Sequence, residues 1–136
     1  MVKMIVGLKG SGKTKTLINL VNTAADTTKG AVVCIQKGSN LIHEITRSVR
    51  LINADDYNIT TANSLYGFVC GVCASNYDIT DIFVDGTMRI CQRDLALIEQ
   101  FVTEAETILA PNNINLTLTL SLDPSDLPEG LKKYVA

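Results

Sequence analysis

The sequence has no tryptophan, three prolines and a single histidine, and its positive and negative charges nearly balance. One histidine, His43, excludes a metal centre built from several histidines. The scarcity of proline and the absence of biased segments exclude a low-complexity chain. A net charge of −2 argues against a general attraction to nucleic acid or to lipid surfaces, although a local basic face would still allow contact with nucleic acid.

A long apolar run is also missing from the chain. No stretch approaches the roughly 20 apolar residues that cross a bilayer. Only a few apolar residues follow Lys3 before Gly7 interrupts them, which is too short for a signal peptide. We therefore expect a cytoplasmic protein without membrane contact.

Cysteine is present but sparse, and in the cytoplasm its side chains are expected to be thiols rather than disulfides. Two of the four form a C-x-x-C pair, and no second pair exists that would complete a zinc site. Buried or half-buried thiols are the favoured interpretation, and a redox pair or a metal site is the alternative. The four residues are Cys34, Cys70, Cys73 and Cys91.

What the chain does contain is an alternation of strand-like and helix-like stretches without linkers or repeats. We predict one domain over residues 1–136, with an α/β fold. It would be a three-layer sandwich, with a mostly parallel sheet of about five strands and helices on both faces. The predicted strands are 1–6, 31–35, 57–60, 81–86 and 114–122. The predicted helices are 12–25, 40–50, 64–74 and 92–109, with a short helix or turn at 129–135.

The most specific motif is the phosphate-binding pattern G-x-x-x-x-G-K-[ST]. Its glycines let backbone N–H groups turn toward an anion, and the following helix adds its dipole. Lys13 would reach the phosphates and the Thr14 hydroxyl would bind Mg²⁺. The alternative is a glycine-rich turn without a ligand. The predicted nucleotide-binding segment is Gly7, Leu8, Lys9, Gly10, Ser11, Gly12, Lys13, Thr14 and Lys15.

A second half of such a site is indicated by the apolar stretch that ends in Asp85. A parallel strand would deliver this carboxylate to the sheet edge beside the glycine loop, where it holds Mg²⁺ directly or through water. The alternative is an aspartate that only caps the following turn. Ser121 and Asp123, at the end of the last predicted strand, are expected on the γ-phosphate side of the same edge.

These features resemble the P-loop NTPases, with a Walker A loop and a degenerate Walker B strand. Within that superfamily the chain is similar to the additional-strand group, which includes RecA-like ATPases, helicase cores and thymidine kinases. The resemblance implies ATP and Mg²⁺ as ligands, Lys13 and Asp85 as catalytic residues, and Thr14 and Asp85 as metal ligands. It also implies that the strand near residues 115–122 lies between the P-loop strand and the Asp85 strand.

The residue after Asp85 departs from this resemblance. Active ATPases of the group usually have a glutamate there that polarises the attacking water, whereas Gly86 offers no base. The chain also lacks the paired-cysteine zinc lobe of thymidine kinases. We therefore expect an ATP- and Mg²⁺-binding protein with weak or partner-dependent hydrolysis, in which a second copy or a partner protein completes the site. If a base lies elsewhere, Asp81, Asp123 and Glu44 are the first candidates.

Two other functions remain open. One is a nucleotide-controlled binding module, or the remnant of a motor-type ATPase, in which ATP orders residues 86–91 for a partner. The other is a kinase for a nucleoside-type hydroxyl acceptor, bound between the loops at 36–40, 61–64 and 86–91. The remaining charged side chains are interpreted as solvated surface, among them Asp55, Asp56, Arg47, Arg50, Arg89 and Arg93.

Overall fold

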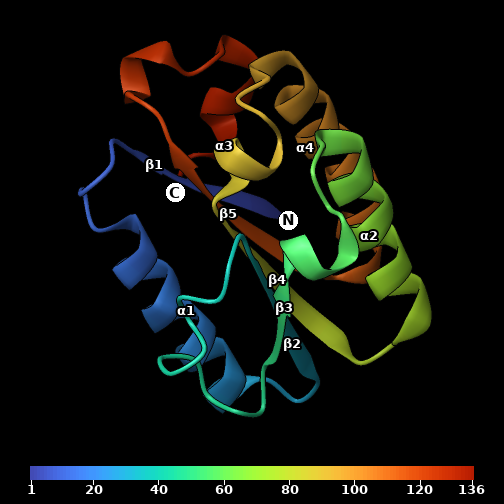
Figure 1. Cartoon of the computed structure of the whole chain (residues 1–136). Helices are drawn as coiled ribbons and strands as arrows, with labels where there is room; N and C mark the ends of the chain where they lie inside the picture. The colour runs from blue at the N-terminus through green and yellow to red at the C-terminus, as the bar shows by residue number, and fades with distance from the viewer.

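The computed structural model describes all 136 residues and confirms the predicted α/β fold (Figure 1). Its core is one sheet of five parallel strands in the order β1-β5-β4-β2-β3. As the resemblance implied, β5 lies between β1 and β4. The strands are β1 (Val2–Gly7), β2 (Ala31–Gln36), β3 (Arg50–Asn53), β4 (Ile79–Asp85) and β5 (Asn115–Ser121).

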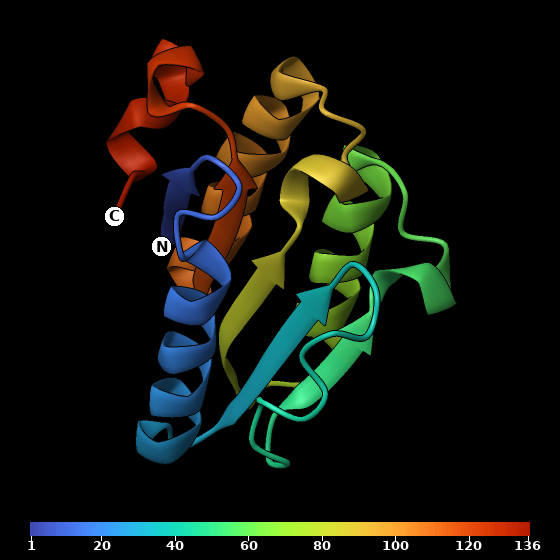
Figure 2. The same ribbon diagram turned by 60° about the vertical axis from the view of Figure 1, so that its left-hand side comes forward.

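Helices cover both faces of the sheet, as Figure 2 shows. Helix α1 (Lys13–Thr27) packs on one face, and α2 (Ala62–Ser75) and α4 (Leu95–Leu109) pack on the other. The strands are apolar on both sides because successive side chains point to opposite faces. Cys34 and Phe83 pack with the buried Leu17 of α1, whereas their neighbours Ile35 and Val84 belong to the larger core under α2 and α4.

Short elements complete the chain and bring its two ends together. Helix α3 (Thr87–Ile90) follows β4 directly, and four 3₁₀ turns lie between or after the main elements. The backbone N–H of Ala136 donates a hydrogen bond to the carbonyl of Met4 (2.9 Å), so the end of the chain lies along β1. The 3₁₀ turns are η1 (Ala54–Tyr57), η2 (Ala110–Asn112), η3 (Pro124–Asp126) and η4 (Glu129–Tyr134).

The predicted helix at 40–50 is wrong, because residues 37–49 form a series of turns. Side chains satisfy the backbone there in place of helical hydrogen bonds. Asn22 of α1 donates to the Glu44 carbonyl (2.9 Å) and accepts from the Thr46 N–H (3.0 Å). Leu41 is buried, whereas the neighbouring Ile42 is 60% exposed, so these turns do not bury a continuous helical face.

Two other predicted boundaries are also corrected. The short strand predicted at 57–60 lies earlier, as β3, and is followed by the 3₁₀ turn η1. The last long helix begins at Leu95 rather than at residue 92, because Asp94 caps it by accepting a hydrogen bond from the Leu97 N–H (3.1 Å). None of the helices combines the length and the apolar character needed to cross a membrane.

Candidate functional site

The glycine loop leaves β1 at the carboxyl edge of the sheet and leads into α1. Gly10 and Gly12 have φ values of 86° and 87°, in the left-handed region that favours glycine. A Cβ on Gly7 would lie 2.5 Å from the Ser11 hydroxyl oxygen, and the Ser11 N–H donates to the Leu8 carbonyl (3.0 Å). The turn therefore closes tightly only because these positions carry no side chain.

Lys13 is the first residue of α1 and the most buried cation of the site, with 8% of its surface exposed. Its ammonium donates to the Leu8 carbonyl at 3.0 Å and forms no ion pair. A buried charge without a counter-charge is unfavourable unless a ligand supplies one. The local geometry is thus complementary to an anion above the loop.

Asp85 ends β4 next to the loop, and the structure brings it close to Thr14. The Thr14 hydroxyl oxygen lies 3.4 and 3.5 Å from the two carboxylate oxygens. A residue that sequence reasoning missed fixes this carboxylate: the Thr119 hydroxyl donates to it at 2.6 Å and accepts from the Gly86 N–H at 3.2 Å. Helix α3 has no side-chain cap, so Asp85 does not serve as one.

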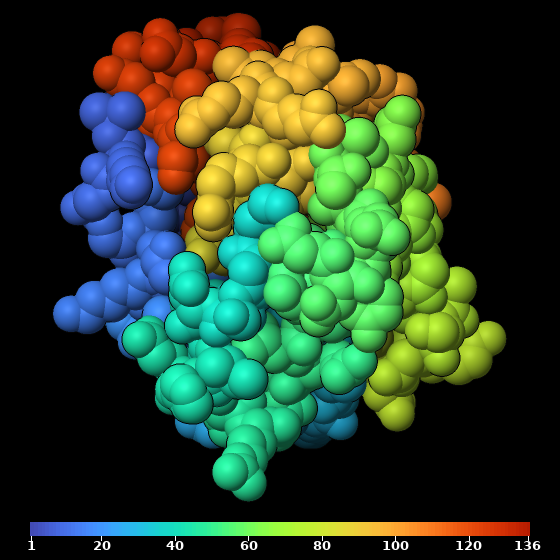
Figure 3. Space-filling view, in the orientation of Figure 1, coloured from blue at the N-terminus to red at the C-terminus, as the bar shows by residue number.

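A pocket of about 790 Å³ opens between the loop and the segment after β4. Figure 3 shows the hollow between the blue surface of the loop and the yellow surface of residues after Asp85. Its lining contains five cations and no acidic residue, and none of these cations forms an ion pair. The lining consists of Leu8, Lys9, Gly10, Gly12, Lys13, Thr14, Lys15, Asn40, Gly86, Met88, Arg89, Arg93 and Ser121.

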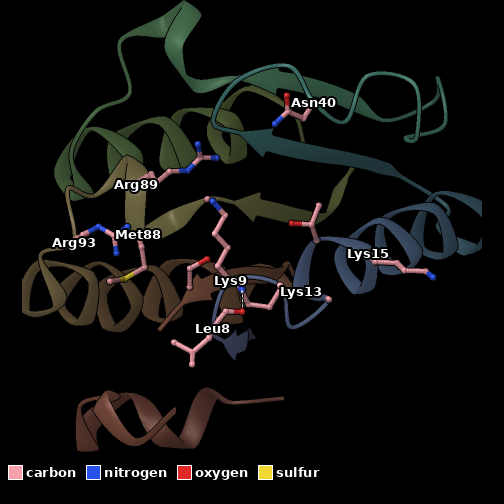
Figure 4. A pocket seen from close by; sticks show the side chains of 13 residues that line it. Leu8, Lys9, Lys13, Lys15, Asn40, Met88, Arg89 and Arg93 are labelled. Atoms are coloured by element: carbon pink, nitrogen blue, oxygen red, sulfur yellow. Dashed lines mark hydrogen bonds between the residues drawn. The ribbon is translucent and has the colours of Figure 1, made fainter. Parts of the chain in front are cut away.

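Arg89 and Arg93 are exposed, as expected for solvated side chains, and both also line the pocket from the side of α3 (Figure 4). Gln92 and Arg93 have φ values of 54° and 57°, and the Arg93 N–H donates to the Met88 carbonyl (2.8 Å). The Gln92 side chain donates to the Thr60 carbonyl (2.8 Å). No sequence pattern predicts this left-handed turn, which places Arg93 in the lining of the pocket.

The three carboxylates considered as bases lie away from the pocket lining. Asp81 lies near the start of β4, at the amino ends of the strands and so opposite the glycine loop. Its carboxylate accepts a hydrogen bond from the Asn115 side-chain amide (3.4 Å). Glu44 belongs to the turns held by Asn22. Asp123, expected on the γ-phosphate side, instead accepts hydrogen bonds from the backbone and hydroxyl of Ser125, which hold its pKa below the usual value. Ser121 lines the pocket as expected.

The cysteines form no metal centre, and no group of three or more histidine, cysteine, aspartate and glutamate side chains is arranged to hold an ion. Cys34 and Cys91 are buried, and Cys70 and Cys73 are half-buried in α2, as the favoured interpretation predicted. Burial, with a smaller contribution from the charge of Asp85, raises the pKa of Cys34 to about 12. Such a thiol stays protonated and packs as an apolar group.

No protein-family model matches this chain, and no match is found among the curated proteins.

Proposed function

We propose that the protein binds a nucleoside triphosphate together with Mg²⁺ in this pocket, and that it hydrolyses the triphosphate only slowly by itself. The observation that carries the proposal is the Lys13 side chain, which is 8% exposed, has no carboxylate partner and lies at the glycine loop that lines the pocket. ATP is the nucleotide that the P-loop resemblance implies. The loop amides and Lys13 would hold the β- and γ-phosphates.

The metal would lie between Thr14 and Asp85. Mg²⁺ accepts one or two carboxylates with water and substrate phosphates, so it needs no larger cluster of protein ligands. The separation of 3.4–3.5 Å between the Thr14 hydroxyl and the carboxylate oxygens allows both groups to face one ion. The Thr119 hydroxyl, which accepts a hydrogen bond from the Gly86 N–H, donates to the carboxylate and fixes its orientation beside Thr14.

Slow hydrolysis follows from the lining of the pocket. Attack by water is faster when a side chain orients it and accepts its proton, and no acidic residue lines this pocket. A second copy or a partner protein that inserted a carboxylate or an arginine would raise the rate. A hydroxyl-bearing acceptor would meet the same lack of a base, which disfavours the nucleoside kinase.

The first prediction is that Lys13→Ala abolishes binding of Mg–ATP. When the concentration of Mg–ATP is 100 times its dissociation constant, the unfolding free energy of the wild-type protein should rise by about 2.7 kcal/mol. The variant should gain none, because the loop loses its buried ammonium. Titration calorimetry and thermal unfolding measure both quantities, and Lys29→Ala, an exposed lysine outside the pocket, is the control. Absence of any stabilisation of the wild type by millimolar Mg–ATP contradicts the proposal.

Turnover of labelled ATP distinguishes a slow ATPase from a binding module without catalysis and from a fast ATPase. Slow release of phosphate by the wild type, together with no release by Lys13→Ala, supports the slow ATPase. Full binding without any release favours the nucleotide-controlled binding module. Rapid release of phosphate by the wild-type protein without any partner would mean that a base outside the pocket lining reaches the attacking water.

A further inference from the structure

The space beside Asp85 is occupied by a cation. A Cβ on Gly86 would lie 3.3 Å from an Arg89 guanidinium nitrogen (Nη2) and 3.2 Å from the Cβ of Lys37. The guanidinium of Arg89 therefore fills the direction in which a side chain at position 86 would point. At the place next to the metal-side carboxylate, the pocket offers a hydrogen-bond donor with a positive charge and no proton acceptor.

The pocket also has more positive charge than one magnesium-bound triphosphate requires. Lys13 and the loop amides lie on the α1 side, and Mg²⁺ itself cancels part of the phosphate charge. Arg89 and Arg93 come from the opposite side, after β4, and Figure 4 shows them apart from Lys13 with Lys9 extending into the space between. Neither arginine has a carboxylate partner. Two unpaired guanidinium groups on one wall are suited to a second phosphate.

We propose that Arg89 and Arg93 bind the phosphate of a second substrate, a phosphate monoester that accepts the γ-phosphoryl group. This proposal rests on the proposed function, in which the pocket binds a nucleoside triphosphate. An ionised oxygen of the monoester attacks the γ-phosphorus and forms a new phosphoanhydride bond. The bond from the γ-phosphorus to its bridging oxygen breaks, and its electron pair leaves with ADP. The products are ADP and a diphosphate ester.

This reaction suits a pocket without a base, because the attacking oxygen carries no proton to be removed. Water and alcohols need a proton acceptor, whereas an anionic nucleophile needs its charge neutralised as it approaches the triphosphate. Two arginines supply that neutralisation, and their forked donors match the oxygens of a phosphate. A dianionic phosphate monoester also fits two cations better than a singly charged carboxylate does.

The binding step is tested with protein saturated with Mg²⁺ and the non-hydrolysable analogue AMP-PNP. Inorganic phosphate is then titrated by calorimetry into the wild type and into Arg89→Gln, Arg93→Gln and, as the control, Arg47→Gln, whose side chain is exposed outside the pocket. We expect one further phosphate on the wild type and the control, and roughly tenfold weaker binding to each pocket variant. Arg89→Lys, which keeps the charge, should recover part of the loss.

The second site is overturned if phosphate only displaces the nucleotide. It is also overturned if phosphate binds the wild type, the control and the two arginine-to-glutamine pocket variants equally well. Failure of AMP-PNP itself to bind is a different result, because it removes the proposed function before the second phosphate is added. Circular dichroism of each variant shows that it is folded before the titration is interpreted.

The transfer step is tested with γ-labelled ATP, Mg²⁺ and a panel of acceptors: the four ribonucleoside 5′-monophosphates, thymidine monophosphate and glycerol 3-phosphate. Label should appear in a diphosphate product of at least one acceptor, faster than in released phosphate. The matching nucleosides and glycerol should remain unlabelled. Label found only in inorganic phosphate, at the rate without acceptor, overturns the acceptor role.

Discussion

At the scale of single residues, the geometry around Asp85 depends on a buried threonine that belongs to neither motif. Thr119 lies on β5, faces the same side of the sheet as Asp85, and bonds both the Asp85 carboxylate and the Gly86 N–H. It is only 2% exposed. The carboxylate is therefore oriented before any ligand arrives, which is how a site built on strands keeps its precision.

We predict that Thr119→Val lowers the free energy of unfolding by about 1–3 kcal/mol and weakens the binding of Mg–ATP. Valine keeps the shape but removes a donor from Asp85 and an acceptor from Gly86, so a partly buried N–H loses its partner. Urea unfolding measures the first effect, and calorimetric titration with Mg–ATP measures the second.

The matched control is Thr117→Val on the same strand. Thr117 faces the same side of the sheet as Thr119 and is 8% exposed, but its hydroxyl bonds neither Asp85 nor Gly86. Its replacement should leave nucleotide affinity unchanged and stability within about 0.5 kcal/mol. Equal losses in the two variants would mean that the hydroxyl of Thr119 has no special role.

At the scale of elements, the sequence predicted what depends on local pattern and missed what depends on distant partners. The strands ending in Gly7 and Asp85 and the helix after the glycine loop follow from apolar runs and glycine chemistry, which act within a few residues. The turns at 37–49 have helical periodicity, but their backbone is held by Asn22, more than twenty positions away. Likewise, the left-handed turn that carries Arg93 is stabilised by contacts of Gln92 with Thr60.

We predict that Asn22→Ala loosens the 37–49 segment and lowers the free energy of unfolding by about 1–2 kcal/mol. The amide of Asn22 donates to the Glu44 carbonyl and its oxygen accepts from the Thr46 N–H, and alanine removes both bonds. Hydrogen exchange should show lost protection at the Thr46 amide, and urea unfolding gives the stability. Asn19→Ala, an exposed position of the same helix, is the control. Unchanged exchange at Thr46 would show that packing of Leu41 alone holds the segment.

At the scale of the whole molecule, charge is distributed unevenly. The chain has a net charge of −2, yet five of its twelve lysines and arginines line one pocket that contains no acid. The two ion pairs, Lys37 with Asp55 and Lys132 with Glu129, lie outside this lining and are solvent-exposed. Pairs of that kind contribute little to stability. Positive potential is therefore concentrated where an anion would bind, and the fold itself depends little on charge.

This arrangement predicts that salt weakens ligand binding far more than it changes the fold. Raising the NaCl concentration from about 0.1 M to about 1 M shortens the Debye length from roughly 10 Å to roughly 3 Å. The affinity for Mg–ATP should then fall by about tenfold, since several unpaired cations act on the ligand together. The melting temperature of the free protein should change little over the same range. Calorimetric titration and thermal unfolding measure the two responses.

Substitutions locate the source of the salt dependence. Lys9→Ala should bind Mg–ATP more weakly and with a shallower dependence on salt, because it removes one of the cations that face the pocket. The double variant Lys132→Ala/Lys133→Ala, altered in the η4 turn outside the pocket, should keep the wild-type dependence. If both variants changed the dependence equally, the attraction would come from the charge of the whole surface. A local effect at the pocket requires that only the first variant differs.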